Sequence, residues 1–136
     1  MNSESPDNRI PLEDRVNILF ASLLDDTGQE VQTSVVADRI SEVLGRPVLE
    51  AELEALRRPG ATRPREDLLL ALARHFDMPG SFLSEDPDDY VTRYSHLDLL
   101  ITQRDKRIPY LPLRASADQL SDDAVRELTK YLKSLD

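Results

Sequence analysis

The sequence has no cysteine and no tryptophan, and it has only two histidines and four glycines among its 136 residues. The absence of cysteine excludes disulfides, thiolate metal sites and cysteine nucleophiles. The glycines stand at positions 28, 45, 60 and 80, too far apart to form a phosphate-binding loop. No apolar run approaches the roughly 18–20 residues of a membrane span, so no membrane partner is expected.

Signals of catalysis are also scarce. His75 and His96 stand alone, one near the end of a predicted helix and one on a predicted helix surface, where a structural or solvated histidine is commoner than a catalytic one. The acidic stretch EDPDDY lacks the central glycine and the distal glutamate of a calcium loop, so we interpret it as a helix cap. The sequence therefore predicts a protein that is not an enzyme and has no catalytic residue, metal site or cofactor.

Acidic residues outnumber basic ones by 26 to 17, which gives a formal net charge of −9. Such a charge argues against simple nonspecific attraction to nucleic acid. The imbalance is uneven, since residues 1–45 carry 9 acids and 3 bases whereas residues 46–80 carry 6 of each. Within that neutral third, residues 55–65 contain four arginines and no acid. Basic charge is therefore concentrated locally, next to a predicted helix that begins near Leu49.

Apolar residues recur at helical spacing along most of the chain, and no strand pattern of useful length is present. The first ten residues are polar and are expected to form a disordered tail. Because they also lack the basic and apolar parts of a signal peptide, we expect a cytoplasmic protein. The predicted fold class is all-α, with helices over residues 12–24, 33–44, 49–58, 65–76 and 88–104, a short helix at 81–83 and a last one from 121.

Each predicted helix has one apolar face that we expect to be buried. Gly45 is well placed to end the second helix, and Thr33 or Ser34 to cap its start. The pair Pro59-Gly60 ends the third helix. The residues predicted to point inward from the second to the fourth helix are Val36, Ile40, Val43, Leu44, Leu49, Leu53, Leu56, Leu68, Leu69, Leu72, Ala73 and Phe76.

The second and third predicted helices are joined by the tight turn GRPV and are followed by a basic loop. This order is typical of a helix-turn-helix, in which the first helix braces against the DNA backbone and the N-terminal half of the second enters the major groove. We therefore expect a helix-turn-helix domain over residues 11–84 and a C-terminal helical dimerisation region over residues 85–136.

The stretch LEALRRPGATRPREDLLLALARHFDMPGSFLSED resembles the segment from the third to the fifth helix of lambda-repressor-like (XRE-type) transcriptional regulators. Over residues 12–135 the chain also resembles, at low identity, the EspR-type regulators of actinobacteria, with RVNILFASL matching their first helix. The resemblance implies a lambda-repressor-like helix-turn-helix bundle in the nucleoid, DNA binding by the N-terminal helices and dimerisation through the last two.

The third predicted helix departs from this family. Its exposed positions hold Glu50, Glu52, Glu54 and Ala55, where relatives usually carry serine, tyrosine, glutamine or arginine. A glutamate accepts a hydrogen bond from cytosine N4, so Glu50 or Glu54 is a candidate for base readout. Three glutamates near phosphates should weaken binding unless arginines offset them. The candidate phosphate contacts are Thr33, Ser34, Arg57, Arg58, Arg63 and Arg65, although the arginines also fit a solvated basic turn.

Two functions follow from these patterns. In the first, the protein is a dimeric transcriptional regulator that binds double-stranded DNA. In the second, the helix-turn-helix is a scaffold whose acidic helix binds a basic protein surface, such as another regulatory protein. The family likeness favours the first function, and the charge of the third helix favours the second.

The last two predicted helices carry apolar stripes that a five-helix DNA-binding module does not need for its own core. We expect these stripes to pack against a second copy of the chain, because two-fold dimers dominate among homo-oligomers and match paired DNA half-sites. The residues predicted to form the homodimer are Tyr90, Tyr94, Leu97, Ile101, Val125, Leu128, Leu132 and Leu135.

Overall fold

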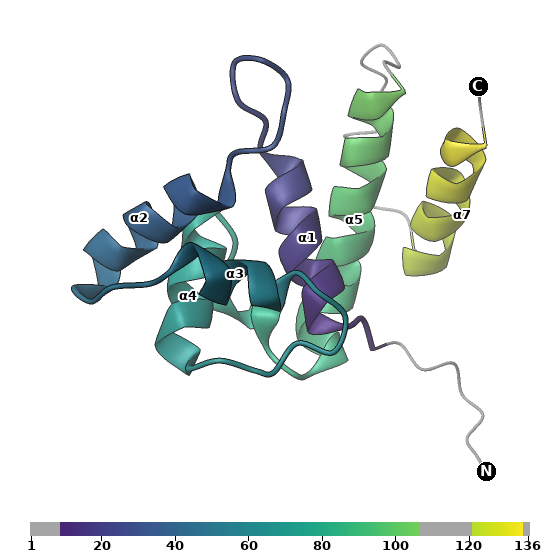
Figure 1. The fold of residues 1–136 in the computed structure, drawn as a ribbon. Coiled ribbons are helices and arrows are strands. Elements are labelled where there is room, and N and C mark those ends of the chain that lie inside the picture. The colour runs from purple at the N-terminus through teal and green to yellow at the C-terminus, as the bar shows by residue number, and fades with distance from the viewer. Residues whose placement is uncertain (1–8, 107–120, 135–136) are drawn as a thin grey trace.

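The computed structural model describes residues 9–106 and 121–134, and every named element in these ranges is helical. The all-α class predicted from the sequence is therefore confirmed. Within those ranges, none of the helices combines the length and the apolarity that a bilayer crossing requires. The elements are α1 (Leu12–Ser22), α2 (Thr33–Leu44), α3 (Glu50–Leu56), α4 (Glu66–His75), the short 3-10 helix η1 (Gly80–Leu83), α5 (Pro87–Asp105) and α7 (Asp122–Lys133) (Figure 1).

The first helix is shorter than predicted. It ends at Ser22, two residues before the expected end at Leu24. Leu23 already has an extended backbone. In the loop that follows, the Asp25 carboxylate accepts hydrogen bonds from the backbone N–H groups of Thr27 and Gln29, at 2.8 and 3.1 Å. Aspartate often stabilises a turn outside a helix in this way.

A tight turn joins α2 to α3. Gly45 ends α2 in the left-handed conformation, with φ of 70°, and its N–H donates to the Ser41 carbonyl at 2.9 Å. The Ser41 hydroxyl in turn accepts a hydrogen bond from the backbone N–H of Val48 at 2.8 Å. The predicted C-terminal cap at Gly45 is therefore confirmed, and Ser41 fixes the turn that follows it.

Two apolar residues predicted to be buried are exposed instead. Val43 is 69% exposed near the end of α2, and Leu49 is 62% exposed just before the first residue of α3. Val48 takes the place expected for Leu49 and is buried, because the chain is still extended at Leu49 when it enters the helix. The other predicted inward residues of α2 to α4 are buried, except the half-buried Leu44.

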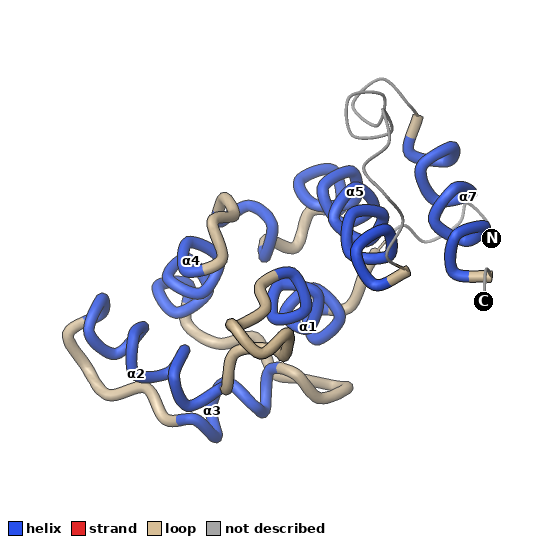
Figure 2. The backbone as a smooth tube through the Cα atoms, turned by 90° about the horizontal axis from the view of Figure 1, so that it is seen from above, coloured by secondary structure: helices blue, strands red, loops and turns tan. Residues whose placement is uncertain are grey.

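The main core gathers side chains from α1, α2, α3, α4, η1 and the start of α5. Figure 2 shows α1 between α3 and α4 on one side and α5 on the other, with α7 on the far side of α5. Phe20 of α1 meets Phe76 at the end of α4, with ring centroids 5.0 Å apart. Phe82 and Leu83 of η1 are fully buried, so this short element closes the core under α4 and α5.

The apolar seam of α5 packs inside the chain. The predicted dimer assumed that this seam had no partner within the same chain, and the structure corrects that assumption. Tyr90 is 1% exposed and belongs to the main core, and its hydroxyl accepts a hydrogen bond from the Ile10 N–H. Tyr94, Leu97 and Ile101 are half-buried and pack against the same core. These residues have a partner in α1, so the main core continues across the predicted domain boundary at residue 84.

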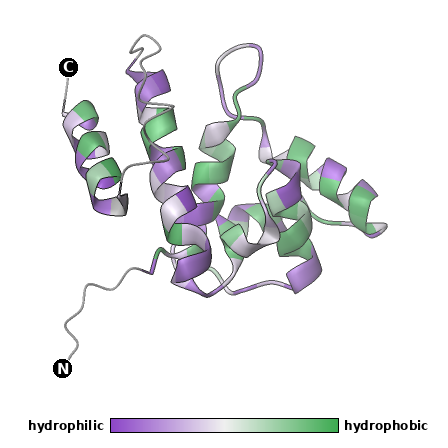
Figure 3. Cartoon of the chain, turned by 180° about the vertical axis from the view of Figure 1, so that it is seen from behind, coloured by the Kyte–Doolittle hydropathy of each residue, from purple (hydrophilic) through white to green (hydrophobic). Residues whose placement is uncertain are grey.

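The stripe of α7 also packs inside the chain. Val125 and Leu132 are buried in a second, smaller cluster with Leu99 of α5, and half-buried Leu128 packs against it. Figure 3 shows hydrophobic and hydrophilic residues alternating along α5 and α7, as expected of amphipathic helices. Leu135, the last residue of the predicted stripe, lies outside the described residues. The stripe therefore covers Leu99, which lies outside the α5 seam.

Candidate nucleic-acid interface

The outer face of α3 is exposed and acidic. Glu50 and Glu52 are exposed and Glu54 is half-buried, while Leu53 and Leu56 anchor the opposite face in the core. The Glu52 carboxylate accepts a hydrogen bond from the N–H of the residue preceding the helix, at 3.1 Å. Glu52 therefore caps the helix start, and Glu50 is an exposed carboxylate in the first turn of the helix.

Arg57 holds three helices together. Its guanidinium donates to the Asn17 side-chain oxygen at 2.6 Å, to the Thr33 hydroxyl at 3.4 Å and to the Glu30 carboxylate at 2.9 Å. It also lies over the Phe20 ring, 4.1 Å from the centroid. Because Nε and both terminal nitrogens already bond to protein acceptors, Arg57 is a structural residue. These contacts argue against the predicted role of Arg57 in binding phosphate.

Replacing Arg57 with methionine is expected to lower the free energy of unfolding by about 2 kcal/mol, because the acceptors on Asn17 and Glu30 lose their donor and the cation–π contact disappears. The matched control is Arg58→Met, which removes the same charge from an exposed neighbour and should change stability by less than about 0.5 kcal/mol. Urea unfolding followed by circular dichroism measures both variants. Equal losses in the two would contradict the role assigned to Arg57.

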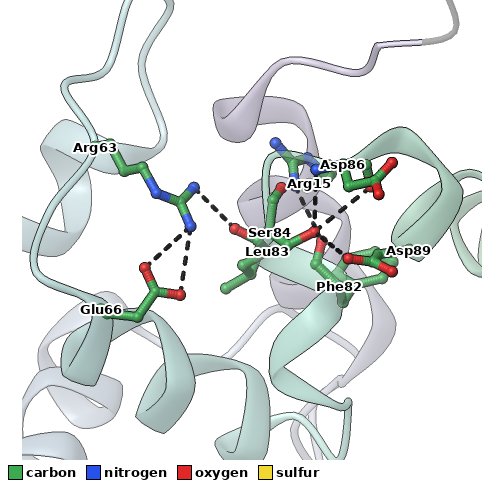
Figure 4. Close-up of polar contacts among 8 residues, drawn as sticks. All are labelled: Arg15, Arg63, Glu66, Phe82, Leu83, Ser84, Asp86 and Asp89. Carbon is green, nitrogen blue, oxygen red and sulfur yellow. Dashed lines mark hydrogen bonds and ion pairs between the residues drawn. The ribbon is translucent and has the colours of Figure 1, made fainter.

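Arg63 is similarly engaged. One terminal nitrogen donates to the Leu83 carbonyl at 2.9 Å, and the other lies 3.2 Å from a Glu66 carboxylate oxygen (Figure 4). The side chain therefore ties the loop before α4 to η1. Two of the four arginines in the basic stretch thus support the fold.

The two remaining arginines of this stretch are exposed. Arg58 follows the end of α3, and the Arg65 side chain is 76% exposed at the start of α4. Arg65 is 3.7 Å from the Asp67 carboxylate, which also accepts a hydrogen bond from Arg46 at 3.2 Å. Desolvation acts to raise the pKa of Asp67, but Arg46 and then Arg65 outweigh it and lower the pKa. An exposed pair such as Arg65–Asp67 is weak, so Arg65 is free to contact another anion.

The start of α2 differs from the prediction. Gln32, and neither Thr33 nor Ser34, is the residue that precedes the helix, and it makes no side-chain cap. Thr33 is 8% exposed, and its hydroxyl accepts from Arg57. Ser34 is half-buried. Of the two hydroxyls proposed for phosphate, only that of Ser34 has an accessible position.

Arg15 is a buried cation that the sequence reasoning missed. It is 4% exposed, and its guanidinium lies 3.9 Å from the centroid of the Tyr90 ring. It donates to the backbone carbonyls of Ile10, Phe82 and Ser84, the last two shown in Figure 4. A signal was available, because position 15 lies on the same helix face as the apolar residues of α1.

Comparisons of the chain with protein-family models, with curated proteins and with solved structures find no match. Among the described residues, no group of three or more histidine, aspartate or glutamate side chains is placed to hold a metal ion. The site that the described residues do build is an exposed helix, α3, behind a glycine turn, with an acidic outer face and exposed arginines at and beyond its C-terminal end.

Proposed function

We propose that this chain is a DNA-binding transcriptional regulator that uses α2 and α3 as a helix-turn-helix of the lambda-repressor-like type. The observation that carries the proposal is the geometry of the α2–α3 pair. The inner faces of both helices share one core, the left-handed Gly45 begins the short turn between them, and no described segment packs over the outer face of α3. An exposed helix held in this way is the arrangement that enters a major groove.

The structure changes which residues we propose to contact DNA. Arg58 and Arg65 are the exposed arginines of the basic stretch and are proposed to contact phosphates, with Ser34 at the start of α2. Glu50 is proposed to accept from a cytosine amino group, because it is exposed in the first turn of α3. Arg57 and Arg63 support this surface from beneath.

The experiment is selection of duplexes from a random pool by the full chain, followed by fluorescence anisotropy on the selected site. We expect Arg58→Ala and Arg65→Ala each to lower the slope of log affinity against log salt by about one, because each removes one phosphate contact. Arg93→Ala, which removes an exposed arginine from α5, is the control and should leave the slope unchanged. Unchanged slopes in all three variants would remove the phosphate role.

Glu50→Gln separates readout from repulsion in the same assay. A change of preference of about 1–3 kcal/mol at one base pair would support readout. Equal tightening on every duplex would mean that the carboxylate only repels phosphate.

A second function is favoured by the charge of α3. Glu50 and Glu52 are exposed on this helix, and the apolar Leu49 is exposed just before it. Such a surface suits a basic protein surface better than a polyanion. In this function the helix-turn-helix is a scaffold that binds another regulatory protein. A folded full chain that enriches no duplex sequence in the selection would favour this function over DNA binding.

We also propose that the regulator is a homodimer, with an interface different from the one predicted. The α5 seam and the α7 stripe are occupied within the chain, so the contact is assigned to Leu100 of α5, 37% exposed, and Tyr131 of α7, 62% exposed. Light scattering at tens of micromolar should give about twice the chain mass of 15.4 kDa. Leu100→Asp with Tyr131→Asp should return one chain mass, and a monomeric wild type would exclude the dimer.

A further inference from the structure

A cavity of about 680 Å³ lies between α5 and α7, next to the segment that precedes α1. This volume falls within the roughly 300–1,000 Å³ of small-molecule sites in proteins. Its position differs from that of the α3 surface, since α5 and α7 lie on the opposite side of α1 (Figure 2). The cavity is therefore a separate feature that neither DNA binding nor the α3 partner uses.

One part of the cavity wall is apolar. Ile10, Val91 and Tyr94 contribute to it, and all three side chains are half-buried. The buried residues Ser95 and Thr129 add hydroxyl groups from the two facing helices. Apolar walls with a few polar groups are typical of sites that bind the body of an organic molecule and fix its orientation.

The charge of the wall is opposite to that of the chain. Its lining contains the four cations Arg9, Arg126, Lys130 and Lys133 against the two acids Asp98 and Asp123, although the whole chain has a net charge of −9. A positive cavity in an acidic protein concentrates anions locally. The ligand that complements it therefore carries negative charge.

The cations differ in how tightly they are held. Lys133 lies 3.1 Å from the Asp98 carboxylate, with both side chains partly exposed. Lys130 is 3.7 Å from Glu127, and both of these side chains are more than 70% exposed, so this pair contributes little and Lys130 can turn to a ligand. Arg126 pairs with Asp123 one turn away, but their side chains are 46% and 87% exposed, so this pair also contributes little and Arg126 can turn to a ligand. Lys130 and Arg126 are the side chains best placed to bind an anionic group.

Tyr94 adds a neutral donor. A phenol of ordinary pKa, about 10, already keeps its proton at neutral pH. Burial, with Asp98 and Asp14 nearby, raises the pKa of Tyr94 further, to about 12. A protonated phenol can donate a hydrogen bond to a carboxylate, sulfonate or phosphate oxygen. The cavity thus combines an apolar wall, a neutral donor and two recruitable cations.

We propose that the cavity between α5 and α7 binds a small amphipathic anion, a molecule with one carboxylate, sulfonate or phosphate group on an apolar body. The apolar body lies against Ile10, Val91 and Tyr94, and the anionic group contacts Lys130 and Arg126. The ligand joins the two helices of the second cluster and stabilises their packing.

The test uses a matched pair of fluorescent probes on the full chain without DNA. Anilinonaphthalene sulfonate carries the anionic group, and N-phenylnaphthylamine has the same aromatic body without it. We expect one sulfonate probe per chain, bound about tenfold more tightly than the neutral probe, since one charge-assisted contact is worth roughly that factor. Lys130→Gln with Arg126→Gln should remove this preference and leave the affinity for the neutral probe unchanged.

Two further variants make the test specific to this cavity. Val91→Trp fills the apolar wall and should weaken both probes at least tenfold. Arg93→Gln removes an exposed cation of α5 outside the lining and should change neither affinity. Equal affinities of wild type for the two probes would overturn the proposal. So would equal effects of Arg93→Gln and of the double variant Lys130→Gln with Arg126→Gln. Loss of sulfonate binding as protein concentration rises would also overturn it, by assigning the cavity to a second copy.

Discussion

Replacing Arg15 with leucine is expected to lower the free energy of unfolding by about 3–5 kcal/mol, because three carbonyl acceptors lose their donor at once. Arg15 is almost fully buried, and it donates to the carbonyls of Ile10, Phe82 and Ser84. Leucine fills part of the space but leaves these acceptors without a donor, and each unsatisfied buried group costs about 1–3 kcal/mol.

The variants Arg15→Lys and Arg93→Leu make this result specific. Lysine keeps the charge but lacks the several donors of the guanidinium. The free energy of unfolding of Arg15→Lys should therefore lie between that of wild type and that of Arg15→Leu. Arg93 is exposed on α5, and its replacement by leucine should cost less than about 0.5 kcal/mol. Urea unfolding followed by circular dichroism gives all three values. A loss in Arg15→Leu as small as that in Arg93→Leu would show that the buried network contributes no stability.

Tyr90→Ala is expected to cost about 3–5 kcal/mol, as is typical when a large buried side chain is truncated. The ring is 1% exposed in the main core and lies under the Arg15 guanidinium. Its hydroxyl accepts from the Ile10 N–H at 3.2 Å. Alanine therefore leaves a cavity and also removes the cation–π contact and the hydrogen bond.

Tyr90→Phe is the control for this second prediction. It keeps the ring and removes only the hydroxyl, so the loss should be about 1 kcal/mol. Thermal unfolding by calorimetry compares the two variants with wild type. If Tyr90→Ala instead left the stability of the monomer unchanged and only weakened self-association, the interface originally predicted for Tyr90 would be correct and its assignment to the core would be wrong.

Local signals explain what could be predicted from the sequence. Gly45 follows the last apolar residue of the helical pattern, and Pro47 comes two positions later. This pattern favours a left-handed cap, so the end of α2 was predictable. The inner face of α4 was also predictable, because Leu68, Leu69, Leu72 and Phe76 repeat at helical spacing between two breakers.

The errors concern residues whose partners are distant in the sequence. Arg57 and Arg63 look like free cations along the chain, yet acceptors in α1, in η1 and in the loop before α2 lie 20 to 40 positions away from them. The α5 seam looks unpartnered because its partner, α1, lies more than 60 residues earlier. The prediction for Val43 was wrong for another reason. Helical spacing shows which residues share a face, but not whether another part of the chain covers that face near the helix end.

The hydrogen bond between Ile10 and Tyr90 also has a consequence for how the chain folds during its synthesis. The two residues are 80 positions apart, so the N-terminal segment cannot reach its final contact until α5 has emerged. At roughly 5–20 residues per second, translation takes about 4–16 s to cover that interval. During this time the inner faces of α1 to α4 lack the part of the core that α5 contributes. The nascent chain therefore exposes apolar surface that promotes aggregation until residue 90 leaves the ribosome.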